Sequence, residues 1–489
     1  MAPVMSLPQA TWSTAYNRFG FGARRLGAPL AGDPREAIEA ELSEPAAGQI
    51  RNAELPSTPQ ALVTLYEYSA SQADERARAD ALRSAGVAMP TPTTAALMLS
   101  PPVSESIMDS KDARPQKPAP NPVVRIYLAE AKARLDAACG APIGFVERLV
   151  AFWSNHFCVS ASKGQNVRIT AGAFEREAIR PFVLGRFVDM LQAVERHPAM
   201  QHYLDNAQSV GPNSRAGQNA KRGLNENLAR EILELHTLGV NGGYTQADVT
   251  EFARVLTGWT VVGREGNLGE PGAFVFNANA HEAGPRDLLG RHYDQDGRAQ
   301  GEAVLADLAA SPATARHISE KFARAFVADS PSPTIVGRLA EVFRKTGGDL
   351  GAMAHALVAD KDAWSAPPTQ LRDPWQMLVA AYRALGLDHS DANRVVHAMT
   401  LLGMPLWTPG GPNGFPDATD AWLSPEGVKT RVEIANMLGR LTKEAPRPRD
   451  LLERILPDAA ESTREAVLRA ESGPQAYALM ILSPEFQRR

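Results

Sequence analysis

The sequence predicts a mainly α-helical protein, and three observations carry this prediction. Apolar residues recur at helical spacing between Gly, Pro and Ser boundaries, as in segments 319–327 and 336–344. Alternating strand patterns are scarce, and the best strand candidate is the short run 274–276. A chain of 489 residues with 44% hydrophobic content can bury a large core. We therefore expect a large multi-helix globular protein with at most a small β-hairpin element.

Net charge and cysteine content narrow the class of protein. The 51 Lys and Arg residues nearly balance the 55 Asp and Glu residues, so no net field favours nucleic acid. Two cysteines, Cys139 and Cys158, are too few for a disulfide framework or a four-thiolate zinc site. The N-terminus has no basic segment followed by an apolar run, and no window is apolar enough to span a membrane. We expect a cytoplasmic protein with no nucleic-acid partner and no membrane span.

A proline-rich segment divides the chain. Residues 59–85 are predicted to form one long charged helix, whereas residues 86–122 hold eight prolines. A regular helix cannot run through so many prolines, so we expect a linker or insertion there. The predicted organisation is an N-terminal helical region (1–85), this linker (86–122), a motif-bearing helical core (123–300) and a C-terminal helical region packed on the core (301–489).

The segment from Gly223 to Gly239 is predicted to be a helix that presents two carboxylates together. At about 100° per residue, Glu231 and Glu234 share one face with Asn227, and Arg230 lies beside them. Two aligned carboxylates can bind a hard divalent cation or share acid and base work, because their repulsion raises one pKa. The alternative is a solvated helix face supported by ion pairs to Arg230.

Histidines near this helix add two candidates. His156 ends the apolar helix predicted within 147–157, where it is either a metal ligand or proton carrier, or a packed C-terminal cap. Two residues on, Cys158 is expected to be a small buried thiol. His236 points roughly opposite Asn227, so we do not expect it to join the carboxylate pair in one mononuclear centre. As a last-turn residue it also complements the helix dipole.

Two further segments contribute candidate ligands. Pro198 is expected to begin a short helix that leads into a polar loop, where Asp205 is a candidate metal ligand and helix capping is the alternative. His281 and Glu282 follow the predicted strand in a non-helical segment. The pair either joins a site built from several helices or lies on a surface loop.

Ten short phrases, in this order along the chain, carry a family resemblance. They are NRFGFGAR (17–24), FWSNHF (152–157), REAIRP (176–181), HPAM (197–200), YLDN (203–206), NENLARE (225–231), ELHTLG (234–239), GGYTQ (242–246), LTGW (256–259) and SPEFQ (483–487). In these phrases the chain resembles the bacterial domain of unknown function family 1800 over nearly its whole length. The resemblance implies family-motif positions for His156, His197, Asp205, Asn206, Asn225, Glu226, Arg230, Glu231, Glu234, His236 and His281.

The resemblance has two further implications. His202 and Cys158 look like local variations, which makes them weaker catalytic candidates. Relatives of this family are often encoded beside a second protein that resembles the alkaline phosphatase superfamily, so a protein of that kind is a possible partner. Many relatives look exported, whereas this sequence shows no export signal.

The sequence supports three hypotheses about function. The leading hypothesis is an enzyme with an unidentified substrate and a buried carboxylate and histidine site, acting by metal-assisted hydrolysis. One alternative is an oxidoreductase with a metal or haem centre, since AsnGluAsn followed by LeuHisThrLeu is similar to a stretch in animal-type haem peroxidases. The other is a non-catalytic scaffold or maturation partner. We assign catalysis to Glu231, Glu234, Arg230, His156 and His236, and ligation of a divalent metal ion to His156, Glu231, Glu234, His281 and Asp205.

One structural criterion separates these hypotheses. An enzyme requires polar groups that converge on an accessible concavity. The scaffold hypothesis predicts polar groups that are dispersed and fully paired, together with a broad apolar surface. The sequence contains no P-loop, dinucleotide fingerprint, zinc-protease helix or serine-hydrolase elbow that would name the reaction.

Overall fold

Helices dominate the structure, which confirms the predicted fold class. The computed structural model describes residues 11–25, 31–84, 121–219, 223–442 and 446–489. Within these residues the strands form two small antiparallel hairpins, where the sequence predicted at most one.

The first half of the chain folds into short and medium helices. Its α-helices are α1 (Trp12–Thr14), α2 (Pro34–Leu42), α3 (Thr58–Ser84), α4 (Pro122–Gly140), α5 (Phe145–His156), α6 (Gln165–Phe174), α7 (Phe187–Arg196), α8 (Pro198–Tyr203), α9 (Asn227–Glu231) and α10 (Gln246–Leu256). Three π-helical turns extend α1, α6 and α9: η1 (Ala15–Phe19), η3 (Glu175–Ile179) and η7 (Ile232–His236). Short 3₁₀ turns lie at η2 (Ala161–Lys163), η4 (Arg180–Phe182), η5 (Asn206–Gln208) and η6 (Gly217–Asn219).

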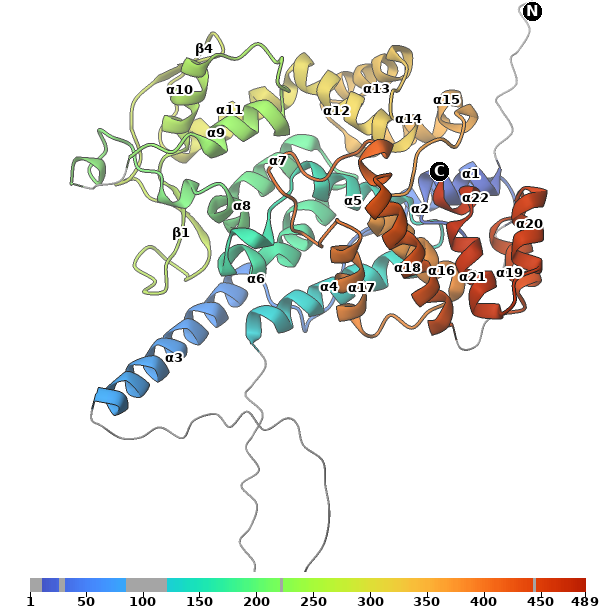
Figure 1. The fold of residues 1–489 in the computed structure, drawn as a ribbon. Coiled ribbons are helices and arrows are strands. Elements are labelled where there is room, and N and C mark those ends of the chain that lie inside the picture. The colour runs from blue at the N-terminus through green and yellow to red at the C-terminus, as the bar shows by residue number, and fades with distance from the viewer. Residues whose placement is uncertain (1–10, 26–30, 85–120, 220–222, 443–445) are drawn as a thin grey trace, which may run out of the picture.

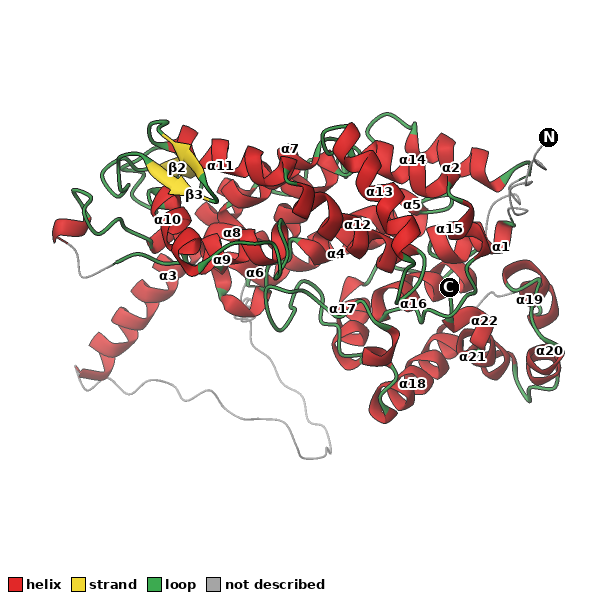
Figure 2. Ribbon diagram, turned by 90° about the horizontal axis from the view of Figure 1, so that it is seen from above, coloured by secondary structure: helices red, strands yellow, loops and turns green. Residues whose placement is uncertain are grey.

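The second half is also helical after the hairpins. Its elements are α11 (Arg298–Ala310), α12 (Pro312–Phe326), α13 (Pro333–Lys345), α14 (Leu350–Ala359), α15 (Lys361–Ser365), α16 (Pro374–Leu385), α17 (Ala392–Leu401), η8 (Thr419–Trp422), α18 (Pro425–Leu441), α19 (Pro448–Ile455), α20 (Glu461–Leu468), α21 (Gly473–Leu482) and α22 (Pro484–Gln487). Figure 2 shows the hairpins at one end of the body beside α10 and α11, and α18 to α22 at the other end.

A recurring capping pattern explains where many of these helices begin. A polar residue followed by proline precedes α12, α13 and α16, where the side chains of Ser311, Ser332 and Asp373 accept backbone N–H groups of the first turn. Proline suits the first helical position because it lacks an N–H that would otherwise have no partner. At α10, Thr245 and Asp248 form a capping box, in which each side chain accepts a backbone N–H of the other residue.

The long helix predicted at 59–85 is confirmed as α3. Figure 1 shows its C-terminal end extending away from the helical body. The predicted linker at 86–122 falls almost entirely on residues 85–120, which lie outside the described residues. None of the described helices combines the length and the apolar character needed to cross a membrane.

One of the two hairpins was predicted. Strand β2 (Phe274–Phe276) pairs with β1 (Trp259–Val261), as expected for the run 274–276. Strands β3 (Arg286–Leu288) and β4 (Arg291–Tyr293) form the second hairpin, whose two-residue turn places Leu289 at φ 53° and Gly290 at φ 71°. A leucine rarely adopts this backbone conformation. The carboxylate of Asp248 accepts the N–H of Leu289 at 2.7 Å, and this long-range contact leaves no local pattern in the sequence.

The helix predicted between Gly223 and Gly239 is shorter and wider than expected. It starts at Asn227 and passes into the π turn η7, which closes its hydrogen bonds over five residues instead of four. The hydroxyl of Thr237 donates to the carbonyl of Ile232 at 2.6 Å and ends the turn. Directions assigned at about 100° per residue therefore fail beyond Ile232.

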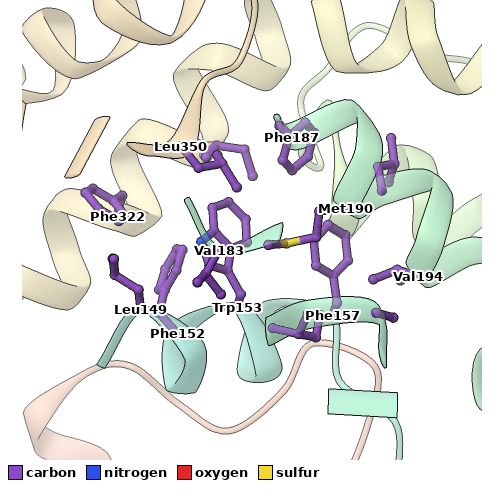
Figure 3. Packing of buried hydrophobic residues seen from close by; sticks show 14 of the residues in the cluster. Leu149, Phe152, Trp153, Phe157, Val183, Phe187, Met190, Val194, Phe322 and Leu350 are labelled. Atoms are coloured by element: carbon purple, nitrogen blue, oxygen red, sulfur yellow. The ribbon is translucent and has the colours of Figure 1, made fainter. Parts of the chain in front are cut away.

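Most of the buried apolar side chains fall into two large clusters. The first cluster surrounds α5 and reaches α12 and α14, and Figure 3 shows Phe152, Trp153 and Phe157 facing Phe187 and Leu350. The second cluster joins α16 to α22 with parts of α4 and with Phe21. The two clusters meet along α4 and α5. The division of the chain into the four regions 1–85, 86–122, 123–300 and 301–489 stays a prediction.

The approach of α6 to α4 gives a direct test of this packing. A Cβ atom at Gly172 of α6 would lie 2.2 Å from Cβ of Glu130 in α4, so we expect Gly172→Ala to lower the free energy of unfolding by about 1–3 kcal/mol. The matched control is Gly337→Ala in α13, where nothing lies within 4 Å of the added carbon. There we expect a gain of up to about 1 kcal/mol, because alanine is the better helix former. Urea denaturation measures both, and equal effects would contradict the packing.

Candidate functional site

A partly enclosed cavity of about 90 Å³ lies where the two hydrophobic clusters meet. We call it the inter-cluster cavity. Phe152 and Trp407 of the first cluster and Trp375 of the second form part of its wall. Its polar wall includes Arg134, Arg148, Asn155, Asp373, Asp417 and Arg489. A space of this size holds several water molecules or one small organic molecule.

Helix α5 presents three residues of the FWSNHF phrase to this cavity. Phe152, Ser154 and Asn155 line it. The next residue, His156, is turned by about 100° around the helix and instead packs among aromatic rings of the first cluster. The sequence therefore identified a helix that lines the cavity, α5, but the predicted site residue His156 lies on another face of it.

A buried network of ion pairs supports one side of the cavity. Glu175, in the π turn η3, lies 3.3 Å from Arg134 and 3.0 Å from Arg180. Arg180 also makes a two-bond pair with Glu147, at 2.8 and 3.0 Å. Ser154 and the indole of Trp407 donate to the same Glu175 oxygen at 3.0 and 3.1 Å. Burial alone would raise the pKa of Glu175, but the two arginine charges outweigh it and lower the pKa.

Asn155 holds the loop that covers the cavity. Its side-chain oxygen accepts the N–H of Phe415 at 2.8 Å, and its amide donates to the carbonyl of Phe415 at 2.9 Å. The loop belongs to the Pro- and Gly-rich stretch 407–416. Gly414 is required here, because its φ is 77° and a Cβ would lie 2.5 Å from the carbonyl oxygen of Asn155.

Two carboxyl groups line the cavity in different surroundings. Asp373 accepts hydrogen bonds from the backbone N–H and the side-chain amide of Gln376, at 2.8 and 2.7 Å. From the described part of the chain, Asp417 accepts one hydrogen bond, from the side-chain amide of Asn155 at 3.5 Å. Burial raises the pKa of Asp417, although the charges of Lys321 and Arg324 oppose the shift.

The predicted site residues His156 and His236 lie deep in the first cluster. Nε2 of His156 donates to the carbonyl of His236 at 3.2 Å, while its Nδ1 is buried without a partner among the described residues. His236 pairs through Nδ1 with Glu195 at 2.8 Å, and both side chains are at most 1% exposed. Burial, followed by the charge of Lys321, holds the pKa of His156 well below its usual value. The ring centroids of His156 and His236 are 6.3 Å apart.

The predicted carboxylate pair has partly separate environments. Glu234 accepts the hydroxyl of Tyr244 at 3.2 Å, and Arg230 pairs with Glu226 at 3.1 Å instead of with either carboxylate of the pair. Burial raises the pKa of Glu231, with the charge of His236 lowering it and that of Glu234 raising it. The expectation that His236 lies away from the pair was based on α geometry, and the π turn η7 removes that basis.

The remaining candidate ligands are held by local contacts. His281 is 6% exposed, and its Nδ1 donates to the carbonyl of Thr257 at 3.0 Å. Glu282 is 4% exposed and accepts two hydrogen bonds from Asn213, so the interpretation of this pair as a surface loop was wrong. Asp205 forms an ion pair with Lys163 at 2.6 Å.

Among the described residues, no group of three or more His, Cys, Asp or Glu side chains is arranged to hold a metal ion. The predicted ligands His156, Glu231, Glu234, His281 and Asp205 are all described, and the structure does not bring them together in such a group. The predicted metal site therefore has no geometric support. Cys158 is a buried thiol, as predicted, and burial raises its pKa to about 12.

Sequence reasoning missed most of the polar residues of the inter-cluster cavity. Arg134, Arg148, Asp373, Asp417 and Arg489 were not among the candidates, because they come from distant parts of the chain and match no short motif. Two signals were available. The FWSNHF phrase marks α5, and the terminal SPEFQ phrase leads directly to Arg489.

Replacing the central carboxylate of the ion-pair network tests its structural weight. Glu175→Gln leaves Arg134 without its carboxylate partner and Arg180 with Glu147 alone, so we expect a loss of about 3–5 kcal/mol in the free energy of unfolding. The control is Glu251→Gln. Glu251 is half-buried and pairs with Arg254 and Arg286, and loss of its charge should cost about 0–1 kcal/mol. Urea denaturation measures both. A loss for Glu175→Gln as small as that of the control would show that the network is not structurally important.

The buried neutral His156 makes stability depend on pH. As pH falls through about 6.5, the unfolded chain takes up a proton at this position while the folded chain does not. We therefore expect the free energy of unfolding to fall between about pH 7 and about pH 5.5, and to fall less steeply in His156→Gln. Three other histidines with lowered pKa values, His202, His281 and His317, keep part of the slope in the variant. The exposed His292→Gln is the control, and parallel slopes for wild type and His156→Gln would refute the assignment.

Comparison with known proteins gives a family and no activity. No curated protein and no solved structure matches the chain. A family model described as protein of unknown function (DUF1800) matches residues 14–488. Because the match covers nearly the whole chain, the protein belongs to the DUF1800 family.

Proposed function

We propose that this protein is an enzyme that acts on a small polar organic molecule in the inter-cluster cavity, with Asp417 as the proton donor. The observation that carries the proposal is the convergence of polar side chains from α4, α5, the loop after α17 and the end of the chain on one partly enclosed cavity. Such convergence distinguishes an enzyme site from a scaffold. The converging residues differ from those that the sequence suggested.

Asp417 suits the role of proton donor. It lines the cavity and makes a single long hydrogen bond, so its carboxyl is available to a bound molecule. Its raised pKa keeps the proton on the carboxyl at a higher pH than in an exposed aspartate. General acid catalysis is most effective when the pKa of the acid approaches the working pH.

The reaction class that fits this arrangement is hydrolysis of an ester. Water adds to the ester carbonyl, Asp417 gives its proton to the alcohol oxygen as the C–O bond of the ester breaks, and the proton released by the added water restores Asp417. Metal-assisted hydrolysis, the form that the sequence suggested, has no group of ligands among the described side chains to support it. We therefore assign the acid to a side chain.

A second candidate function is a scaffold or maturation partner for a protein that resembles the alkaline phosphatase superfamily. One observation favours it: the polar residues predicted from sequence are dispersed, and several are paired with a neighbour. Examples are His236 with Glu195, Asp205 with Lys163 and Arg230 with Glu226. Such pairing is expected of residues that stabilise a fold.

Substitution of Asp417 tests the enzyme proposal. The full chain is assayed against the ethyl esters of acetate, butyrate and phosphate, whose poor leaving groups need a proton donor, and we expect turnover of at least one ester to fall about 10²–10⁴-fold in Asp417→Asn. The exposed Asp420→Asn, three residues away, is the matched control and should act like wild type. Activity should also decline as pH rises through the pKa of Asp417. Turnover no faster than in buffer, or an Asp417→Asn variant as active as wild type, contradicts the proposal.

A further inference from the structure

Two arginines on the wall of the inter-cluster cavity have no acidic partner. Arg148 and Arg489 are 3% and 6% exposed, and neither forms an ion pair with any described residue. Arg148 donates to the carbonyls of Arg18, Gly20 and Ala325. Arg489 donates to Ala325 and to the side chain of Gln370. Carbonyl groups satisfy these hydrogen bonds but do not neutralise the charge.

The two positive charges are close together. Nη2 of Arg148 and Nη1 of Arg489 donate to the same carbonyl oxygen, that of Ala325, at 3.3 and 2.7 Å. Burial, together with the charge of Arg489, holds the pKa of Arg148 well below its usual value. Two like charges in a poorly solvated place repel each other, and an anion bound near both would relieve that repulsion.

The acidic groups near the cavity offset these charges only in part. The charge of Asp373 acts on both arginines, and those of Asp329 and Asp417 act on Arg489. Asp373 directs its two oxygens to Gln376 and forms no ion pair with an arginine. Asp417 has a raised pKa because of burial, which favours its neutral form. Glu175 is already shared by Arg134 and Arg180. The wall therefore keeps two buried guanidinium groups whose charge is offset by carboxylates at longer range and by no ion pair among the described residues.

Two buried polar atoms on the same wall lack a partner. Nε of Arg489 donates to no described residue, and Oε1 of Gln376 accepts from none. Both residues line the cavity and are at least nine-tenths buried. Buried polar groups in proteins nearly always have a hydrogen-bond partner, so this donor and this acceptor are wall groups that a bound molecule would satisfy.

The rest of the wall restricts the kind of anion. Trp375, Trp407 and Trp422 line the cavity with Phe152 and Phe326, so much of the surface that a ligand meets is apolar. This surface favours an organic anion over a fully hydrated inorganic one. The volume of about 90 Å³ restricts it to a small molecule. Guanidinium groups bind a planar carboxylate through paired hydrogen bonds.

We infer that the inter-cluster cavity binds a small organic carboxylate, with its anionic group held by Arg148 and Arg489 and its apolar part against the aromatic wall. The inference depends on the proposed function only in treating this carboxylate as the substrate or product. Binding itself needs no catalysis, so the two proposals can fail separately.

Isothermal titration calorimetry on the full chain tests the inference. The probes are butyrate and benzoate, their neutral counterparts butyramide and benzamide, and inorganic phosphate. We expect at least one acid to bind with a Kd below about 10 mM, while its amide binds about tenfold or more weakly. Equal binding of acid and amide, or no binding of either acid, overturns the inference. Phosphate binding as tight as that of both acids overturns the assignment of a carboxylate.

Variants locate the binding group. Arg489→Gln keeps a donor for the carbonyl of Ala325 but removes the charge, and we expect it to weaken carboxylate binding about tenfold or more. Arg489→Lys keeps the charge and should retain part of the affinity. Arg488→Gln removes the same charge from an exposed neighbour and should bind like wild type. Circular dichroism checks that each variant is folded. A folded Arg489→Gln with unchanged affinity overturns the inference, whatever Asp417→Asn does in the ester assay.

Discussion

The buried carboxylate of Glu175 is the interaction on which the arrangement of this molecule depends. Glu175 forms ion pairs with Arg134 of α4 and Arg180 of the adjoining turn. It accepts hydrogen bonds from Ser154 of α5 and from the indole of Trp407 in the loop after α17. These segments are far apart in the sequence. Burying a charge is costly unless opposite charges and hydrogen bonds surround it. Two arginines and two glutamates meet this condition here, so the network can lie between two apolar clusters.

Helix α5 carries one buried charge that is neutralised by an ion pair and another that is not. Glu147 and Arg148 are neighbours in α5, and both are buried. Glu147 belongs to the neutralised network, through Arg180. Arg148 is turned to the other side, where it meets carbonyl oxygens and Arg489. The closed network is complete without a ligand, whereas Arg148 has Arg489 beside it and is offset by the charge of Asp373 without an ion pair. This contrast separates a structural ion cluster from a binding site.

Sequence reasoning succeeded where structure is determined locally. Helix α3, the capping box at Thr245 and strand β2 follow from spacing and capping, which short windows of sequence contain. It failed where distant contacts decide. The turn at Leu289 depends on Asp248, and the cavity depends on arginines whose partners are backbone carbonyls of remote residues. A backbone carbonyl exists at every residue, so no residue type marks these contacts in advance.

The histidines that attracted functional interpretation have a coherent structural explanation. The π turn η7 ends with carbonyl groups that have no partner inside the helix. His156 from α5 donates to the carbonyl of His236, and His317 from α12 donates to the carbonyl of Leu235 at 3.1 Å. Two helices thus cap the end of a third through neutral imidazoles, whose pKa values burial lowers. A neutral imidazole can donate from Nε2 without bringing a charge into the core. These histidines therefore satisfy the carbonyl groups at the end of a helix inside an apolar cluster. The polar side chains that line the inter-cluster cavity lie on the other side of α5.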